Sequence, residues 1–350
     1  MLERRDYRHA TIAVSMCIAL MSVSVGNAHH SRSAFNLDAT IMIDGTVTEV
    51  GWTNPHYYLG VRDETTGQTQ EWTFEGHSIP GLVRNGWSRS TLAVGSRVSL
   101  VANPNSDPEV LFGLLNHVTR RDGKTFYSFR PTDEMLQMQK PPLAPSTDFT
   151  GTWRIIRSLR SNLVGGFEPP TDWPLTDLAH EEVARFDVND DPSLSCEARG
   201  VPRMLSWPYS QKWINQGADL FVTLEHAVEE RTLFDEKTVM IPKSSHDLGQ
   251  SRILSRTDTE LVVETRGFSP KFWGLTRGVS SGIAKVVTEK YELVEDGYRL
   301  KLTLTLADPL SLSEPVTDTL YYAKVHDFDF AAEPSCDVGT AKRHLEFERG

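Results

Sequence analysis

Residues 284–309 read AKVVTEKYELVEDGYRLKLTLTLADP. Apolar and polar residues alternate on both sides of Glu295-Asp296-Gly297, which is the period of a half-buried β-strand. An acidic residue followed by Gly between two alternating runs is typical of a hairpin turn. The stretch therefore predicts two long antiparallel strands and a fold assembled from hairpins.

The same alternation recurs through residues 149–350. The one clear helical pattern is LTDLAHEEVARFD, where Thr176 or Asp177 could provide the N-cap. A meander of hairpins predicts an antiparallel barrel of the calycin or lipocalin type, able to hold a small ligand. The alternating runs lie at residues 149–156, 219–234, 260–268, 284–309 and 316–325.

Residues 29–130 predict a second, smaller all-β unit. Three alternating stretches, one short helix or turn, and then a strand and a hairpin follow one another along this part of the chain. This order is that of an OB-like five-stranded barrel. Between the two units, residues 131–148 are rich in Pro and polar residues and are expected to form a linker.

The first 28 residues have the pattern of a signal peptide. Arg4, Arg5 and Arg8 precede an uncharged apolar run, and Gly26-Asn27-Ala28 provides a small-residue cleavage site. The run is shorter than the ~20 residues that cross a bilayer comfortably. We therefore expect a protein exported to the periplasm or secreted, with no transmembrane segment left after cleavage.

Two parts of the chain carry family resemblances. AHHSRSAFN and GTVTEVGWTNPHYYLGV, within residues 28–120, resemble an uncharacterised family of exported bacterial domains with an A-H-H-S start and a G-x-V…W-x-N-P-H pattern. The C-terminal part is similar to another uncharacterised exported group, through C-x-x-x-G-V-P-R at 196–203, LGQS, LVVET and ADP. Gly151-Thr152-Trp153 also resembles the entry strand of lipocalins. Neither exported family brings an activity with it.

Composition limits the partners. The chain has a formal net charge of −11, 39% hydrophobic and 24% charged residues, as in a folded globular protein. An acidic surface without a basic stripe repels phosphate backbones, so we expect no nucleic acid partner. The motifs of nucleotide-binding, serine hydrolase, zinc protease and dithiol enzymes do not occur in a supporting context.

The cysteines predict one disulfide. Cys17 leaves with the signal peptide, so Cys196 and Cys336 are the pair that remains. In an oxidising compartment two cysteines most simply form a bond with each other. That bond would tie the C-terminal tail to the segment CEARGVPRM.

The predicted C-terminal barrel contains both ionisable and aromatic candidates for a site. If one strand face lines the barrel, carboxylates near a cation and an imidazole could act as general acid and base; a solvated outer face with ordinary ion pairs is the alternative. Large aromatics near Pro and Gly loops would suit an apolar ligand at the barrel mouth, or could be core residues. The catalytic candidates are Glu229, Arg231, His246, Glu264 and Glu289, and the ligand-binding candidates are Trp207, Tyr209, Trp213, Phe272 and Trp273.

The mature N-terminus offers a copper site. If cleavage exposes His29, its α-amine and its Nδ1 can chelate Cu(II), with His30 or His56 as the third nitrogen. The alternative is a mobile terminus, with His56 placed beside Trp52 for packing.

These observations leave three functional hypotheses. The first is an exported protein that binds a small, partly apolar ligand in the C-terminal barrel, with the OB-like domain as an interaction module. The second is a cofactor-independent lyase, isomerase or hydrolase that uses the barrel carboxylates and His246. The third is copper binding through His29.

Overall fold

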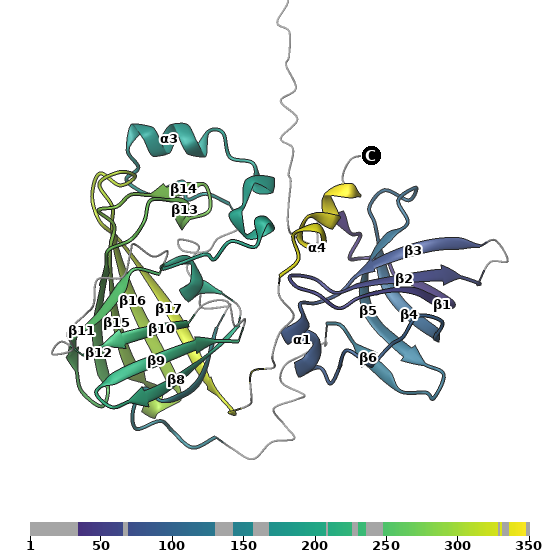
Figure 1. Cartoon of the computed structure of the whole chain (residues 1–350), viewed down its shortest axis with the longest axis horizontal. Helices are drawn as coiled ribbons and strands as arrows, with labels where there is room; N and C mark the ends of the chain where they lie inside the picture. Colours follow the sequence, from purple (N-terminus) through teal and green to yellow (C-terminus); the bar gives the residue numbers. More distant parts are fainter. Residues whose placement is uncertain are drawn as a thin grey trace, which may run out of the picture.

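The computed structural model describes residues 34–65, 69–129, 143–156, 168–207, 209–225, 230–235, 248–327, 330 and 336–347. Within them the chain forms two β-barrels with short helices around them (Figure 1). None of the helices in these ranges has the length and apolar character needed to cross a membrane. The predicted signal peptide and most of the predicted linker lie outside the described residues.

The first barrel confirms the OB-like prediction. Its strands follow the order β3-β2-β1-β4-β5, and a parallel pairing of β3 with β5 closes the ring. The short helix α1 (Ile79–Arg84) lies between β3 and β4 along the chain, as the OB order requires. The strands are β1 (Ile41–Gly51), β2 (Tyr58–Asp63), β3 (Gln70–Glu75), β4 (Arg97–Pro104), β5 (Phe112–Arg120) and β6 (Thr125–Tyr127), which pairs with β5.

The G-x-V part of the first motif has a packing reason. A Cβ at Gly45 would lie 2.2 Å from the backbone oxygen of Arg62 on β2, so only glycine lets the two strands approach. Two residues later, Val47 points into the core with 1% exposure. The motif thus combines a close strand contact with a buried side chain on the same face of β1.

The W-x-N-P-H part of the motif joins the β1–β2 connection to α1. Trp52 packs edge-on against Tyr57, at 5.9 Å between ring centroids. The fully buried Asn54 accepts a hydrogen bond from the backbone N–H of Ile79 at the start of α1. Its polar side chain is buried because it satisfies a helix-terminal donor that would otherwise lack a partner.

The second barrel has nine strands, in the closed order β10-β11-β12-β15-β16-β17-β7-β8-β9. All neighbours are antiparallel except β10 and β11, which run parallel over two residue pairs. A parallel pair needs a crossover connection, so the barrel is not a pure meander. Its strands are β7 (Gly151–Ile155), β8 (Ser210–Gln216), β9 (Asp219–Leu224), β10 (Glu230–Phe234), β11 (Gln250–Arg256), β12 (Glu260–Arg266), β15 (Val286–Val294), β16 (Arg299–Ala307) and β17 (Val316–Val325).

The hairpin at 284–309 forms as its sequence predicts. β15 and β16 pair without interruption from Val286↔Ala307 to Val294↔Arg299. Buried and partly exposed residues alternate along the whole of β16, so its leucines face the barrel interior. Gly297 in the turn has φ +84°, and a Cβ there would lie 2.1 Å from the Ser146 backbone oxygen. Glycine is required on both counts.

A cap lies at one end of the second barrel (Figure 1). It contains α3 (Asp177–Val183), the hairpin β13 (Lys271–Thr276) and β14 (Val279–Ser281), and the 3₁₀ turns η3 (Val188–Asp190), η4 (Pro192–Ser195) and η5 (Arg203–Ser206). Of the two N-cap candidates for α3, the structure selects Thr176, whose hydroxyl accepts from the Ala179 N–H. Glu182 of α3 accepts the Ser280 N–H of β14 and fixes the helix to the hairpin.

The C-terminal segment, residues 336–347, connects the two barrels. Cys336 forms the predicted disulfide with Cys196 of the cap. The segment continues through α4 (Val338–Lys342) and η7 (Arg343–Glu346), which lie against the first barrel (Figure 1). Asn54 accepts a backbone hydrogen bond from Asp337. The sequence predicts only that this disulfide ties the C-terminal tail to the segment that begins at Cys196. In the structure the same bond connects the cap of the second barrel to a segment that lies against the first barrel.

Two side chains fix this segment on the first barrel. Arg343 binds both carboxylate oxygens of Glu49, at 2.6 and 2.7 Å. Phe347 stacks on Phe112 with ring centroids 4.1 Å apart. The aromatic contact extends a small cluster, separate from the core of the first barrel, that contains Phe35, Tyr58, Phe112 and Leu114.

We expect Cys336→Ser to lower the melting temperature by several degrees under non-reducing conditions, because removing a native disulfide costs about 2–5 kcal/mol. Phe347→Ala keeps the bond and should have a smaller effect. Thermal unfolding of the three proteins measures the difference. Two thiols alkylated in denatured, non-reduced wild-type protein would contradict the disulfide itself.

Candidate functional site

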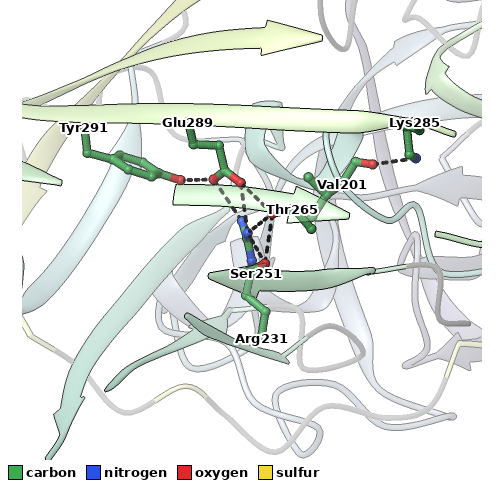
Figure 2. A network of polar contacts seen from close by, with 7 residues as sticks. All are labelled: Val201, Arg231, Ser251, Thr265, Lys285, Glu289 and Tyr291. Carbon is green, nitrogen blue, oxygen red and sulfur yellow. Dashed lines mark hydrogen bonds and ion pairs between the residues drawn. The ribbon is translucent and has the colours of Figure 1, made fainter. Parts of the chain in front are cut away.

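A polar network lies inside the second barrel. Its members come from four strands and, except for Arg231 at 6% exposed, are no more than 3% exposed. Strand alternation places each on the inner face, beside neighbours that are buried leucines, valines and isoleucines. We call this group the interior polar network: Arg231 on β10, Ser251 on β11, Thr265 on β12, and Glu289 and Tyr291 on β15 (Figure 2).

Arg231 is the centre of the network. Its two terminal nitrogens each donate to one oxygen of Glu289, both at 2.9 Å. One of them also donates to the hydroxyls of Ser251, at 2.6 Å, and Thr265, at 3.1 Å. This bidentate geometry is the strongest that an arginine and a carboxylate form. A charge on β10 is thereby bonded to three other strands.

The remaining contacts of Glu289 complete its hydrogen bonding. Tyr291 donates its hydroxyl proton to Glu289 Oε2 at 2.5 Å (Figure 2). Burial and the adjacent negative charge of Glu289 raise the pKa of Tyr291 well above its ordinary value. Burial alone would lower the pKa of Arg231, but the attraction of Glu289 outweighs it and the pKa is raised. The network is therefore one cation paired with one anion, surrounded by neutral hydroxyls.

One buried donor of this network, Nε of Arg231, has no hydrogen-bond acceptor among the described residues. Gln211 on β8 lies beside the network and hydrogen-bonds to the Tyr322 hydroxyl. It is connected to the network through Trp213, which donates to Gln211 Oε1 at 3.4 Å and packs edge-on against Tyr291 at 4.9 Å. A buried polar group without a partner costs ~1–3 kcal/mol, so Arg231 Nε is the group of the network whose hydrogen bonding the described residues leave incomplete.

The arrangement favours binding over proton transfer. Both oxygens of Glu289 already receive bonds from Arg231, and Tyr291 adds a third. A general base needs a lone pair directed at its substrate. In the interior polar network the unmatched group is a donor, Arg231 Nε, so the arrangement could hold an acceptor atom.

A buried lysine connects the barrel wall to the cap. Lys285, directly before β15, donates to the backbone oxygen of Val201 at 2.9 Å (Figure 2). It also donates to the backbone oxygen of Gly274, at 3.2 Å. Its ammonium also lies 4.0 Å from the centroid of the Phe268 ring, a cation–π contact. Both carbonyls belong to cap segments, so Lys285 fixes the cap over this end of the barrel.

The C-x-x-x-G-V-P-R motif has its role in the cap. Arg203 binds both oxygens of Asp191, at 2.9 and 3.2 Å, and Arg277 binds the same carboxylate at 2.9 Å. Burial opposes the charged form of Asp191, but the positive charges of Arg203, Arg199 and Arg277 outweigh it, and its pKa lies below the usual range. Asp191 and Lys285 were not predicted from the sequence; a buried charge carries no periodic signal.

The catalytic candidates divide into three groups. Arg231 and Glu289 come together in the interior polar network. Glu264 lies on the outer face of β12, where it pairs with Arg266 at 2.6 and 3.0 Å. Glu229 and His246 lie outside the described residues. The predicted polar lining of the barrel is thus built on one ion pair, and Glu264 does not contribute to it.

The aromatic candidates occupy three separate places. Trp213 lies in the barrel interior against Tyr291. Trp207 and Tyr209 stack on each other at 5.2 Å, after the cap turn η5. Phe272 and Trp273 are on β13, where Phe272 is 49% exposed. They do not line one site, and Trp213 is the candidate that contacts the interior polar network.

The described residues do not test the copper hypothesis. His56 Nδ1 lies 3.1 Å from Glu75 Oε1, and His29 and His30 lie outside the described residues. His344 of the C-terminal segment faces His56; burial and the charge of His56 lower the pKa of His344 to about 4. Across the residues that the structure describes, no three metal-binding side chains are grouped. Copper binding at His29 stays a prediction.

Comparison with known protein families gives a match in the N-terminal part of the chain. Residues 17–111 match a family of unknown function, DUF6152. The match includes the G-x-V and W-x-N-P-H motifs, and it supports the predicted resemblance of the N-terminal part to an uncharacterised family. It does not reach the second barrel. No curated protein matches the chain.

We expect Glu289→Gln to destabilise the protein by about 3 kcal/mol, because it leaves the Arg231 charge buried without its counter-ion. Glu264→Gln, the same substitution on the outer face of the same barrel, should cost less than about 1 kcal/mol. Urea unfolding compares the two. Equal effects would show that Arg231 and Glu289 are not a buried pair.

Proposed function

We propose that this chain is an exported protein that binds one small, partly apolar molecule inside its C-terminal barrel. The observation that carries the proposal is the unmatched Arg231 Nε, a charged donor buried in an apolar interior. A ligand that supplies an acceptor there would remove the cost of the bare donor. The interior of an eight-stranded barrel is filled by side chains or holds one small ligand, and the diameter grows with the number of strands. This barrel has nine strands.

The catalytic alternative has less support. An acid–base enzyme would need a carboxylate in the barrel that can accept a proton from substrate. Of the predicted carboxylates that the structure describes, Glu289 is held by Arg231 and Tyr291, and Glu264 faces outward. We therefore favour a binding protein over a lyase, isomerase or hydrolase.

Export is supported by two independent features. The N-terminal sequence has the basic, apolar and small-residue segments of a signal peptide in the required order. Cys196 and Cys336 are paired, and structural disulfides persist mainly in oxidising compartments. We place the mature protein in the periplasm or outside the cell.

A test of ligand binding uses N-phenyl-1-naphthylamine, a neutral fluorescent probe for apolar sites. We expect saturable, blue-shifted emission with the wild-type protein. Val263→Phe adds bulk to the inner face of β12 and should weaken binding at least ~10-fold, whereas Val262→Phe on the opposite face should not. Equal binding by both variants would place the probe outside the barrel.

Folding of the Val263→Phe protein is checked by thermal unfolding. If it does not fold, native mass spectrometry of wild-type protein from its producing cells provides the second measurement. A reproducible added mass of one small molecule supports the proposal. A protein that carries no added mass and does not bind the probe would refute it.

The export proposal predicts a mature chain that begins at His29. Intact-mass measurement of the protein recovered after expression of residues 1–350 should show loss of the first 28 residues. Ala28→Asp replaces the small residue at the cleavage site and should block processing. A full-length mass for the wild-type protein in the periplasmic or extracellular fraction would contradict the cleavage site, and recovery only in the cytoplasm would contradict export.

A further inference from the structure

We infer that the barrel selects a neutral ligand with an apolar body and an acceptor oxygen, such as a ketone, ester or lactone, whose oxygen is bound by Arg231 Nε. This inference rests on the proposed function and adds the chemical class of the ligand. It excludes carboxylates and phosphates, which are the ligands that a buried arginine would ordinarily suggest.

The first argument is charge. The positive charge of Arg231 is balanced by Glu289 at 2.9 Å. Asp318 on β17 is also buried and is close enough to raise the pKa of Tyr322, which faces the same interior. The positive charge of Lys285 lies at the cap end, against backbone oxygens of the cap. A bound anion would add a negative charge without a counter-ion, and burying such a charge is costly.

The second argument is the kind of hydrogen bond on offer. Arg231 Nε can only donate, and no acceptor among the described residues reaches it. The neighbouring Gln211 has an acceptor, because the Tyr322 hydroxyl donates its proton to the Leu205 backbone oxygen at 2.6 Å and keeps its lone pairs for the Gln211 amide. The ligand must therefore bring an acceptor atom for Arg231. A carbonyl oxygen has two lone pairs and no charge, which matches this donor.

The third argument is the surroundings of the donor. The rings of Trp213 and Tyr291 lie edge to face beside the polar atoms. Apolar side chains form the rest of the inner wall: Leu220, Val222, Leu233, Ile253, Val263 and Leu304. A ligand of this class would place its oxygen on Arg231 and its hydrocarbon part on these residues.

The experiment measures how well three molecules displace N-phenyl-1-naphthylamine from the wild-type protein at neutral pH. They have similar chain length and differ in their polar group: 2-undecanone, decanoate and undecane. We expect 2-undecanone to compete at least ~10-fold better than either of the others, since a hydrogen bond to a charged donor is worth about that factor.

A matched pair of double variants locates the effect. Arg231→Met with Glu289→Gln removes the interior ion pair without leaving a bare charge, and should reduce the preference for 2-undecanone over undecane to less than ~3-fold. Arg266→Met with Glu264→Gln makes the same two substitutions on the outer face and should keep the wild-type preference. If the interior variant does not fold, Arg231→Lys keeps a positive charge opposite Glu289 while it removes the guanidinium Nε, and it should also reduce the preference.

The outcomes are distinct. Best competition by decanoate, or equal competition by ketone and alkane, would overturn the inference while leaving a binding barrel intact. A ketone preference that survives in the folded interior variant, or in Arg231→Lys if only that variant folds, would place the acceptor elsewhere and overturn it as well. Failure of the probe to bind wild-type protein at all would instead count against the proposed function.

Discussion

The closure of the second barrel depends on the ion pair between Arg231 and Glu289. The parallel pairing of β10 with β11 is short, covering only Leu233↔Ser251 and Phe234↔Arg252. Arg231 bridges that seam from the inside, since its guanidinium binds a hydroxyl on β11, another on β12 and the carboxylate on β15. These charged bonds join four strands where the backbone ladder contributes least.

Such a pair is not the most stable way to fill a barrel. Desolvating both charges is expensive, and well-packed apolar residues in their place are often as stable or more so. What the ion pair adds is a fixed orientation of the Arg231 side chain. Both oxygens of Glu289 hold the plane of the guanidinium, and this plane sets the direction of its Nε–H, which has no acceptor among the described residues. The same bonds that bridge the β10–β11 seam therefore also orient the donor of the proposed ligand site.

The sequence predicted the strands of the second barrel better than it predicted how those strands close into a ring. Alternation in 284–309 gives the strands, the turn at Gly297 and the inward leucines of β16, because period and turn chemistry are local. Alternation alone does not say which face is inside. Glu225, directly after β9, pairs with Arg84 of the first barrel, whereas Arg231 on β10 points into the second barrel. The parallel seam and the buried Asp191 depend on contacts between distant segments, which no local pattern records.

The disulfide was predicted from the two cysteines alone, and in the structure it also connects the two halves of the chain. Cys196 lies in the cap segment that leads to Arg203, which binds Asp191 inside the cap, and Lys285 holds the cap from the wall of the second barrel. Cys336 holds it from outside, through a C-terminal segment that the first barrel fixes at Asn54, Glu49 and Phe112. The motif residue Asn54 therefore serves α1 and this segment at once. The first barrel acts as a support for the cap of the second, so the closed end of the barrel is held by both halves of the chain.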